Sequence, residues 1–283
     1  MNWTACILKV PESLQEQMIA ELLDFGFTSF EQFDQSLHCF MSSESLSDKT
    51  LSRTRNLLQR YSLPDEIKIE QFEETNWNER WEQSIRPVRT GPFLIYPSWF
   101  AVQPETDVIP IQIDPKMSFG TGFHATTRLM LRSLPGLMAA NPTNVLDAGT
   151  GTGILAIAAA KLGAQSVTGF DIDPWSKRNA MENRKANRVE KQTTFLLGTI
   201  DQLSENTQFD LILVNINRNT ILEMAHALVK RLHPEGSLLL SGLLHSDQSI
   251  ILEVFEKEGL NLMGEKREKE WISLQLSSTD SRF

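Results

Sequence analysis

The sequence predicts a doubly wound α/β domain that follows a small α+β domain, and three observations carry this prediction. From about residue 119 onward, apolar strand-like runs alternate with helical stretches, which is typical of a mostly parallel sheet with helices on both faces. A glycine-rich loop lies between the first such strand and the first such helix. Asp171 ends the next strand, 22 residues after Gly149, the first glycine of that loop, and an acidic residue there is typical of nucleotide-binding sheets.

The first part of the chain predicts a compact α+β domain. Apolar residues recur on one face of a helix over residues 12–25, and Gly26 is placed to end that helix. A second amphipathic helix is expected over residues 50–61. Strands are expected at residues 6–10, 27–33, 37–41 and 67–72. This order of elements is that of a ferredoxin-like domain.

Residues 63–118 are rich in tryptophan and proline, which breaks helices and limits central strands. We expect a linker helix over residues 77–84, around Trp77 and Trp81, and then short strands. The expected organisation is a first domain at residues 1–62, a linker at 63–84 and a second domain at 85–283.

The second domain is expected to alternate strands and helices up to the end of the chain. Strands are predicted at residues 144–148, 166–170, 194–197, 210–214, 236–241 and 271–276. Helices are predicted at residues 127–134, 154–162, 174–187, 220–232 and 247–259.

Composition excludes several classes of function. The formal net charge of −9 disfavours a nucleic-acid backbone as partner, because that affinity comes from clustered Lys and Arg. Cys6 and Cys39 have no metal-type spacing and are expected to be buried apolar residues, and the five histidines suggest no metal site. No apolar run approaches the length of a membrane span, and residues 1–10 do not resemble a signal peptide. We therefore expect a cytoplasmic protein without a metal cofactor.

The central motif reads VLDAGTGTGI, with glycines at Gly149, Gly151 and Gly153. A dinucleotide-binding loop has its third glycine one place later, where this chain has Ile154. Asp147 precedes the loop, and its carboxylate would repel a pyrophosphate at the helix N-terminus. That carboxylate suits S-adenosylmethionine instead, which carries an ammonium and a sulfonium. The sequence therefore predicts an S-adenosylmethionine-dependent methyltransferase; a glycine-rich turn without a ligand is the alternative.

Polar residues at two further strand ends are candidates for the same site. Asp171 is placed to accept hydrogen bonds from ribose hydroxyls, although a turn or cap residue is the alternative. Asp173 is interpreted as the N-cap of the following helix, with Pro174 at its first position. Asn215 ends the fourth strand and is expected to hold the cofactor or to accept a hydrogen bond from an incoming amine; capping the next helix is its alternative role.

Other functions remain open at this point. A methyltransferase acting on another protein, on nucleic acid or on a small molecule is the first, although the run after Asn215 lacks the prolines and aromatic residue of adenine methyltransferases. An NAD-dependent oxidoreductase is the second, and Ile154 and Asp147 argue against it. A binding protein without catalytic activity is the third.

Three sets of residues resemble the PrmA family of ribosomal protein methyltransferases. Residues 119–127, FGTGFHATT, resemble the family's FGTGTHPTT. Residues 147–157 and 170–174 resemble its glycine loop and the following GIDIDP. Residues 77–81 and 96–99 resemble its DWxxxW and PSW patterns. The resemblance extends from about residue 77 to the end of the chain.

The resemblance implies a function and a set of site residues. It implies methylation of amino groups, on lysine side chains or the N-terminus, of large-subunit ribosomal protein L11, which the small N-terminal domain would grip. Its cofactor contacts fall on Thr127, Gly149, Asp171 and Asn215. We assign four further residues to the cofactor site: Asp147, Gly151, Phe119 and Gly120. Asn215 is the candidate catalytic residue, and a monomer is expected.

The chain departs from the family pattern at three positions. Phe123 replaces the usual Thr, Ala125 the usual Pro, and Asn217 the usual Leu. These departures are expected to change the wall of the substrate channel and to leave the cofactor contacts intact. His124 lies in the same loop and is expected to be a satisfied polar group, with direct catalysis as the alternative.

Overall fold

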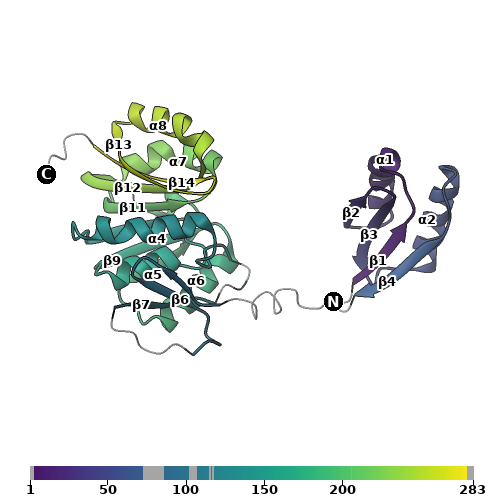
Figure 1. Ribbon diagram of the computed structural model, residues 1–283, viewed down its shortest axis with the longest axis horizontal. Coiled ribbons are helices and arrows are strands. Elements are labelled where there is room, and N and C mark those ends of the chain that lie inside the picture. The colour runs from purple at the N-terminus through teal and green to yellow at the C-terminus, as the bar shows by residue number, and fades with distance from the viewer. Residues whose placement is uncertain are drawn as a thin grey trace. The chain divides into compact units, whose positions relative to one another are not determined.

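The structure is a computed structural model that describes residues 3–72, 86–101, 107–114, 116, 118–204 and 206–278. The chain divides into two compact units, Met1–Trp81 and Glu82–Phe283, which are described separately (Figure 1). The linker helix predicted over residues 77–84 lies outside the described residues. Among the described helices, none is long and apolar enough to cross a membrane.

The first unit holds a four-stranded antiparallel sheet with two helices packed on one face (Figure 1). Its elements follow the order β1 (Trp3–Leu8), α1 (Glu12–Leu23), β2 (Ser29–Phe33), β3 (Ser36–Ser42), α2 (Asp48–Arg60) and β4 (Ile67–Phe72). The strand order β2-β3-β1-β4 is that of the expected ferredoxin-like domain. Strand β4 is an edge strand of this sheet, although it lies beyond residue 62.

Both cysteines lie in the apolar core between this sheet and its helices. Cys6 and Cys39 are fully buried and unpaired. Burial raises the pKa of the Cys6 thiol to about 11 and that of Cys39 further still. The expectation of buried apolar cysteines is confirmed.

The second unit is organised around a seven-stranded sheet of order β10-β9-β8-β11-β12-β14-β13. The strands are β8 (Asn144–Ala148), β9 (Ser166–Asp171), β10 (Thr193–Leu197), β11 (Phe209–Asn215), β12 (Leu232–Leu244), β13 (Leu260–Glu268) and β14 (Trp271–Ser278). The five strands from β10 to β12 pair in parallel, whereas β14 is antiparallel to both of its neighbours. This is the predicted doubly wound architecture with one reversed strand inserted near its edge.

Helices cover both faces of this sheet, as predicted. Helices α4 (Ala125–Met138), α5 (Ile154–Lys161) and α6 (Pro174–Ala186) form one layer, and α7 (Arg218–Lys230) and α8 (Gln248–Lys257) form the other (Figure 1). Along β11 the apolar residues alternate between two cores: Leu211 and Leu213 face the first layer, and Ile212 and Val214 the second. Two short 3-10 helices, η1 (Ile200–Gln202) and η2 (His245–Asp247), complete the second layer.

A small three-stranded sheet precedes α4. Its strands are β5 (Val88–Thr90), β6 (Phe93–Tyr96) and β7 (Ile109–Gln112). Phe93, Ile95 and Ile111 join the core under α4 and α5. The small sheet thereby anchors the segment that leads into residues 119–124.

Several elements differ in their bounds from the sequence-based expectation, among them β1 and β12, and two of the differences have a clear local cause. Strand β13 was not predicted, because most of its residues are exposed and it lacks a regular apolar alternation. Helix α4 begins earlier and ends later than the predicted residues 127–134, since His124 caps its start and the helix continues through Pro135 to Met138.

Candidate functional site

A cavity of about 900 Å³ opens at the carboxyl ends of the parallel strands, where ligands bind in such sheets. The loops after β8, β9, β10 and β11 surround it, and α7 forms one wall. Its polar and charged lining residues are His124, Thr126, Asp171, Ser176, Thr199, Asp201, Asn215, Asn217, Thr220 and Glu223. Its apolar lining includes Phe119, Phe170, Ile172, Ile200, Ile216, Met224, Ala227 and Trp271.

The glycine-rich loop after β8 forms the floor of the cavity. Gly149 and Gly151 have φ angles of +74° and +53°, which favour glycine. A Cβ atom on Gly149 would lie 2.3 Å from Ile216 Cγ2, and one on Gly151 would lie 2.3 Å from the Phe119 carbonyl oxygen. The loop is therefore packed so closely against two neighbouring segments that no side chain fits at these positions.

Asp171 lies beside this loop at the end of β9. Its Oδ2 accepts a hydrogen bond from the Gly151 amide at 2.9 Å, and its Oδ1 accepts one from the Asp173 amide at 3.0 Å. These hydrogen bonds fix the direction of both oxygens. Each oxygen can still accept a further hydrogen bond from a ligand at the cavity wall. Asp173 accepts hydrogen bonds from the Trp175 and Ser176 amides, which confirms its predicted role as N-cap of α6.

Asp147 lies behind the glycine loop, not in the cavity lining. It is 1% exposed, and its Oδ2 accepts hydrogen bonds from the Thr150 hydroxyl at 2.7 Å and the Ala156 amide at 3.1 Å. Its Oδ1 is buried without a hydrogen-bond partner. Burial raises the pKa of this carboxyl to about 6. Its direct contacts are thus with the loop and the start of α5.

Asn215 projects from the end of β11 into the cavity lining. It is 7% exposed, and its Nδ2 lies 3.4 Å from the Thr127 hydroxyl, to which it donates. Its Oδ1 is buried without a hydrogen-bond partner. The cap of α7 is Asn217, whose Oδ1 accepts from the Thr220 amide at 3.0 Å. Asn215 therefore lines the cavity with an unused, buried acceptor in its side chain, and it does not cap the helix.

Residues 119–124 lie against the glycine loop and form an adjoining wall of the cavity. The Thr152 amide and hydroxyl donate to the carbonyl oxygens of Phe119 and Gly120, at 2.9 and 2.6 Å. Phe119 lines the cavity with half of its side chain exposed, whereas Gly120 lies behind it. The two loops are thus joined directly.

His124 caps α4 and belongs to an aromatic edge of the cavity. Its Nδ1 lies 2.8 Å from the Thr126 hydroxyl, and burial lowers the pKa of its ring. The ring lies 5.3 Å from that of Phe119 and 4.8 Å from that of Trp271 between centroids. These contacts agree with the expectation that His124 is a polar residue whose hydrogen bonding is satisfied within the protein.

The structure gathers five of the predicted residues in the cavity lining and three just behind it. The lining contains Phe119, Gly149, Gly151, Asp171 and Asn215. Gly120, Thr127 and Asp147 support them from behind. Sequence reasoning missed Trp271: strand β14 is antiparallel, so its first residue lies at the carboxyl edge of the parallel strands.

The shape and chemistry of the cavity fit S-adenosylmethionine. The close glycine floor admits a ligand against the backbone, the Asp171 carboxylate can accept from ribose hydroxyls, and Asn215 Oδ1 offers an unused acceptor. Its charged lining residues are carboxylates, Asp171, Asp201 and Glu223, which suits a ligand that carries positive charge. Among the described residues, no group of His, Cys, Asp or Glu is arranged to hold a metal ion.

The strand order with its reversed inner strand, together with a cavity above a glycine-rich first loop, defines a Rossmann-like methyltransferase domain. Comparison of the sequence with known families then identifies the particular group. The pattern of the family described as "Ribosomal protein L11 methyltransferase (PrmA)" matches residues 7–279, and the chain belongs to this family.

Individual relatives agree with this membership. A protein of Porphyromonas gingivalis named "Ribosomal protein L11 methyltransferase" is 38% identical over 94% of this chain and 91% of its own length. A protein of Chlorobaculum parvum with the same name is 35% identical over 96% of this chain and 95% of its own. A crystal structure of a "ribosomal protein L11 methylase" from Lactobacillus delbrueckii subsp. bulgaricus matches with a TM-score of 0.63 and 31% identity. It covers 69% of this chain and 99% of that one.

Proposed function

We propose that this protein transfers methyl groups from S-adenosylmethionine to amino groups of ribosomal protein L11, on lysine side chains or the N-terminus. Membership of the family supports the substrate. The observation that carries the chemistry is that Asn215 lines the cavity and that its buried Oδ1 has no hydrogen-bond partner. A buried acceptor without a partner is unfavourable unless a ligand donates to it.

The cofactor supplies an electrophilic methyl group on a sulfonium. We assign its site to the backbone of Gly149 and Gly151, with the Asp171 carboxylate receiving the ribose hydroxyls. Phe119 forms the adjoining wall, and Thr152 holds it and Gly120 against the glycine loop. Thr127 holds Asn215 from behind, and Asp147 holds the glycine loop in shape. No metal ion has a role in this proposal.

Asn215 is the proposed catalytic residue because it can orient the acceptor. Its Oδ1 would accept a hydrogen bond from an N–H of the amine, so that the nitrogen lone pair points at the methyl group. Holding the two reacting atoms in this orientation favours the reaction. The amine must be neutral to attack, whereas a free lysine has a pKa of about 10.4. Desolvation in the cavity, together with the positive charge of the sulfonium, lowers the pKa of the amine toward neutrality.

The charge of the cavity favours an amine over a nucleic-acid substrate. Its lining contains carboxylates and no Lys or Arg among the described residues. Phosphate groups bind through Lys, Arg and backbone amides, so a cavity of this charge repels them. The net charge of −9 over the whole chain likewise disfavours a nucleic-acid substrate.

We further propose that the N-terminal domain grips the ribosomal protein while the second domain carries the chemistry. The division into two compact units supports this separation of roles. The protein is proposed to act as a cytoplasmic monomer.

Incubation of the full chain with labelled S-adenosylmethionine and a panel of acceptors tests the function. The panel contains ribosomal protein L11, bulk ribosomal proteins, RNA and no acceptor. We expect label on L11 alone, and its loss in Asp171→Ala. Label on another acceptor would retain the methyltransferase and contradict the substrate.

The role of Asn215 is tested separately by Asn215→Ala at saturating cofactor. Removing an orienting contact made in the transition state is expected to lower kcat by about a hundredfold or more. Full turnover in this variant would contradict the role.

A further inference from the structure

Helix α6 and its C-cap carry three asparagines spaced four residues apart, Asn179, Asn183 and Asn187. All three are buried, with exposed fractions of 3%, 3% and 6%. A buried amide is unfavourable unless its donors and acceptor are used. The partners of these side chains therefore show what this polar face of the helix does.

Asn187 binds the edge of the small sheet. Its Nδ2 donates to the Gln112 carbonyl at 2.6 Å, and its Oδ1 accepts from the Gln112 amide at 3.0 Å. The side chain thus pairs with the end of β7 as a neighbouring strand would. Among the described residues, the Asn187 side chain makes no hydrogen bond to the glycine loop.

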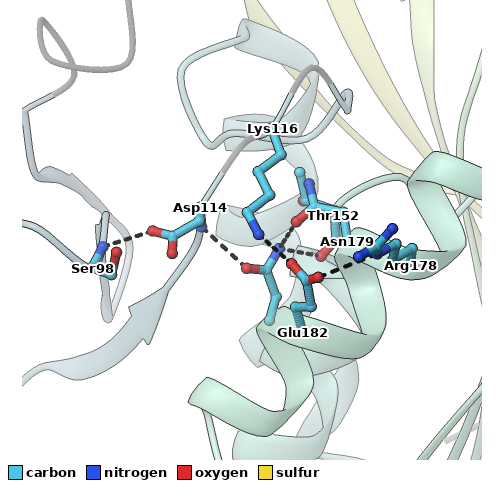
Figure 2. A network of polar contacts seen from close by, with 8 residues as sticks. Ser98, Asp114, Lys116, Thr152, Arg178, Asn179 and Glu182 are labelled. Carbon is cyan, nitrogen blue, oxygen red and sulfur yellow. Dashed lines mark hydrogen bonds and ion pairs between the residues drawn. The ribbon is translucent and has the colours of Figure 1, made fainter. Parts of the chain in front are cut away.

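Asn183 makes a different set of contacts, one turn earlier. Its Oδ1 accepts from the Asp114 amide at 3.1 Å, and its Nδ2 donates to the Thr152 carbonyl at 2.9 Å and to Asn179 Oδ1 at 3.2 Å. Figure 2 shows these contacts between the chain at Asp114, the glycine loop at Thr152 and helix α6. One amide therefore joins the segment before Phe119 to the loop after β8.

Thr152 completes a closed ring of contacts. Its amide and hydroxyl hold the carbonyl oxygens of Phe119 and Gly120, while its own carbonyl accepts from Asn183. Asp114 is held in turn, because its Oδ1 accepts from the Ser98 amide at 2.7 Å. Phe119 is thus bonded to Thr152 directly, and Asp114 is linked to the same residue through Asn183.

Exposed ion pairs lie beside this ring of hydrogen bonds, but they do not connect the same segments. Lys116 and Arg178 both pair with Glu182, on the outer side of α6 (Figure 2). Their side chains are about half exposed or more, so the pairs add little to stability. The buried amide of Asn183 is the link that these exposed pairs do not provide.

We propose that Asn183 is a positioning residue for the cofactor: it holds the glycine loop and the Phe119 segment in register against each other, and hence fixes the shape of the cavity that both of them line. The proposal rests on the cofactor site assigned above. Asn183 lies outside the cavity lining, so its effect on binding acts through Thr152. Asn187 provides a matched control, since it has the same side chain, similar burial and its own hydrogen bonds to Gln112, two residues before Asp114, but none to the glycine loop among the described residues.

Calorimetric titration of the full chain with S-adenosylhomocysteine tests this role without turnover. We expect Asn183→Ala to bind S-adenosylhomocysteine about tenfold more weakly than the wild type. A tenfold loss of affinity corresponds to about 1.4 kcal/mol, which is the net value expected for the lost hydrogen bonds. Asn187→Ala is expected to stay within twofold, although both variants lower the melting temperature. Equal loss in both variants, or wild-type affinity in Asn183→Ala, would overturn the inference.

A second variant tests the route and covers the case in which Asn183→Ala does not fold. Thr152→Val keeps the shape of the side chain and removes the bond to the Gly120 carbonyl. We expect it to weaken binding by about fivefold, and to act non-additively with Asn183→Ala where both fold. Unchanged affinity in Thr152→Val would overturn the inference. A wild-type chain that does not bind S-adenosylhomocysteine would instead refute the proposed function itself.

Discussion

Single glycine residues control how closely the two cavity loops approach. At Gly151 a Cβ would lie 2.3 Å from the Phe119 carbonyl, which is backbone and cannot turn away. We predict that Gly151→Ala moves residues 119–120 and lowers kcat/KM by at least a hundredfold, together with affinity for S-adenosylhomocysteine. Steady-state kinetics and calorimetry measure both effects.

Gly163→Ala is the control for backbone strain alone. Gly163 has a φ of +109°, yet no atom lies within 4 Å of its added Cβ. We expect this variant to lose about 1–2 kcal/mol of stability and to keep wild-type kinetics. If both substitutions impaired activity equally, strain and not the contact with Phe119 would be the cause.

The buried carboxyl of Asp147 is expected to make the stability of the folded protein depend on pH. Burial raises the pKa of its carboxyl from 3.8 to about 6 in the folded chain. The folded protein therefore binds more protons than the unfolded chain between these values, and this residue's contribution to stability falls as the pH rises through the window. Two pKa units correspond to about 3 kcal/mol.

Urea unfolding of the wild type and Asp147→Asn at pH 4 and pH 7 measures this effect. We expect the wild type to lose on the order of 3 kcal/mol relative to the variant between the two pH values. Asp173→Asn is the control, because amide hydrogen bonds at the start of α6 lower the pKa of Asp173 from its ordinary 3.8, so that its contribution to stability is lost only as the pH falls below this interval. A constant difference between the wild type and Asp147→Asn would show that Asp147 ionises normally.

At the scale of elements, an ion-pair cluster ties α4 to the β13–β14 hairpin. Glu268 pairs with both Arg128 and Arg132, and Arg128 also donates to the Phe123 carbonyl. The Glu268 side chain is 18% exposed, and burial beside Arg128 lowers the pKa of Arg132. The cluster thereby holds the loop of Phe119 near the strand that begins at Trp271.

We predict that Glu268→Gln leaves two guanidinium groups facing each other without a counter-charge. The expected loss is about 2 kcal/mol of stability, with a lower kcat/KM because the loop and hairpin no longer hold each other. Glu253→Gln breaks an exposed pair with Lys257 and is expected to change neither quantity. Equal effects of the two substitutions would contradict the structural role of the Glu268 cluster.

Sequence reasoning succeeds where a pattern is local and fails where a contact depends on strand order. Strands β4 and β8 have the predicted bounds, because β4 begins with alternating apolar and charged residues and β8 is a short run that ends at the glycine loop. The glycine loop and Asp171 could be placed together, since both follow neighbouring strands of a parallel sheet. Trp271 could not be placed, because it reaches the cavity only through the reversal of β14. The roles of Asn183 and Asp147 depend on buried hydrogen bonds that no spacing in the sequence specifies.

At the scale of the whole molecule, the two compact units predict separable activities. The cavity and every residue proposed to hold the cofactor lie within residues 118–271. We predict that residues 82–283 alone bind S-adenosylhomocysteine within twofold of the full chain. Methylation of ribosomal protein L11 by this fragment is expected to fall by on the order of a hundredfold in kcat/KM, because docking no longer raises the local concentration of the acceptor.

Adding residues 1–81 in trans separates docking from folding in this experiment. If tethering is what matters, the free N-terminal unit does not restore the rate and inhibits the full chain by competing for the ribosomal protein. A fragment that binds the cofactor and methylates L11 at the full rate would contradict the division of roles, since the second unit would then recognise the substrate alone. Loss of cofactor binding in the fragment would show instead that the first unit is needed to form the cavity.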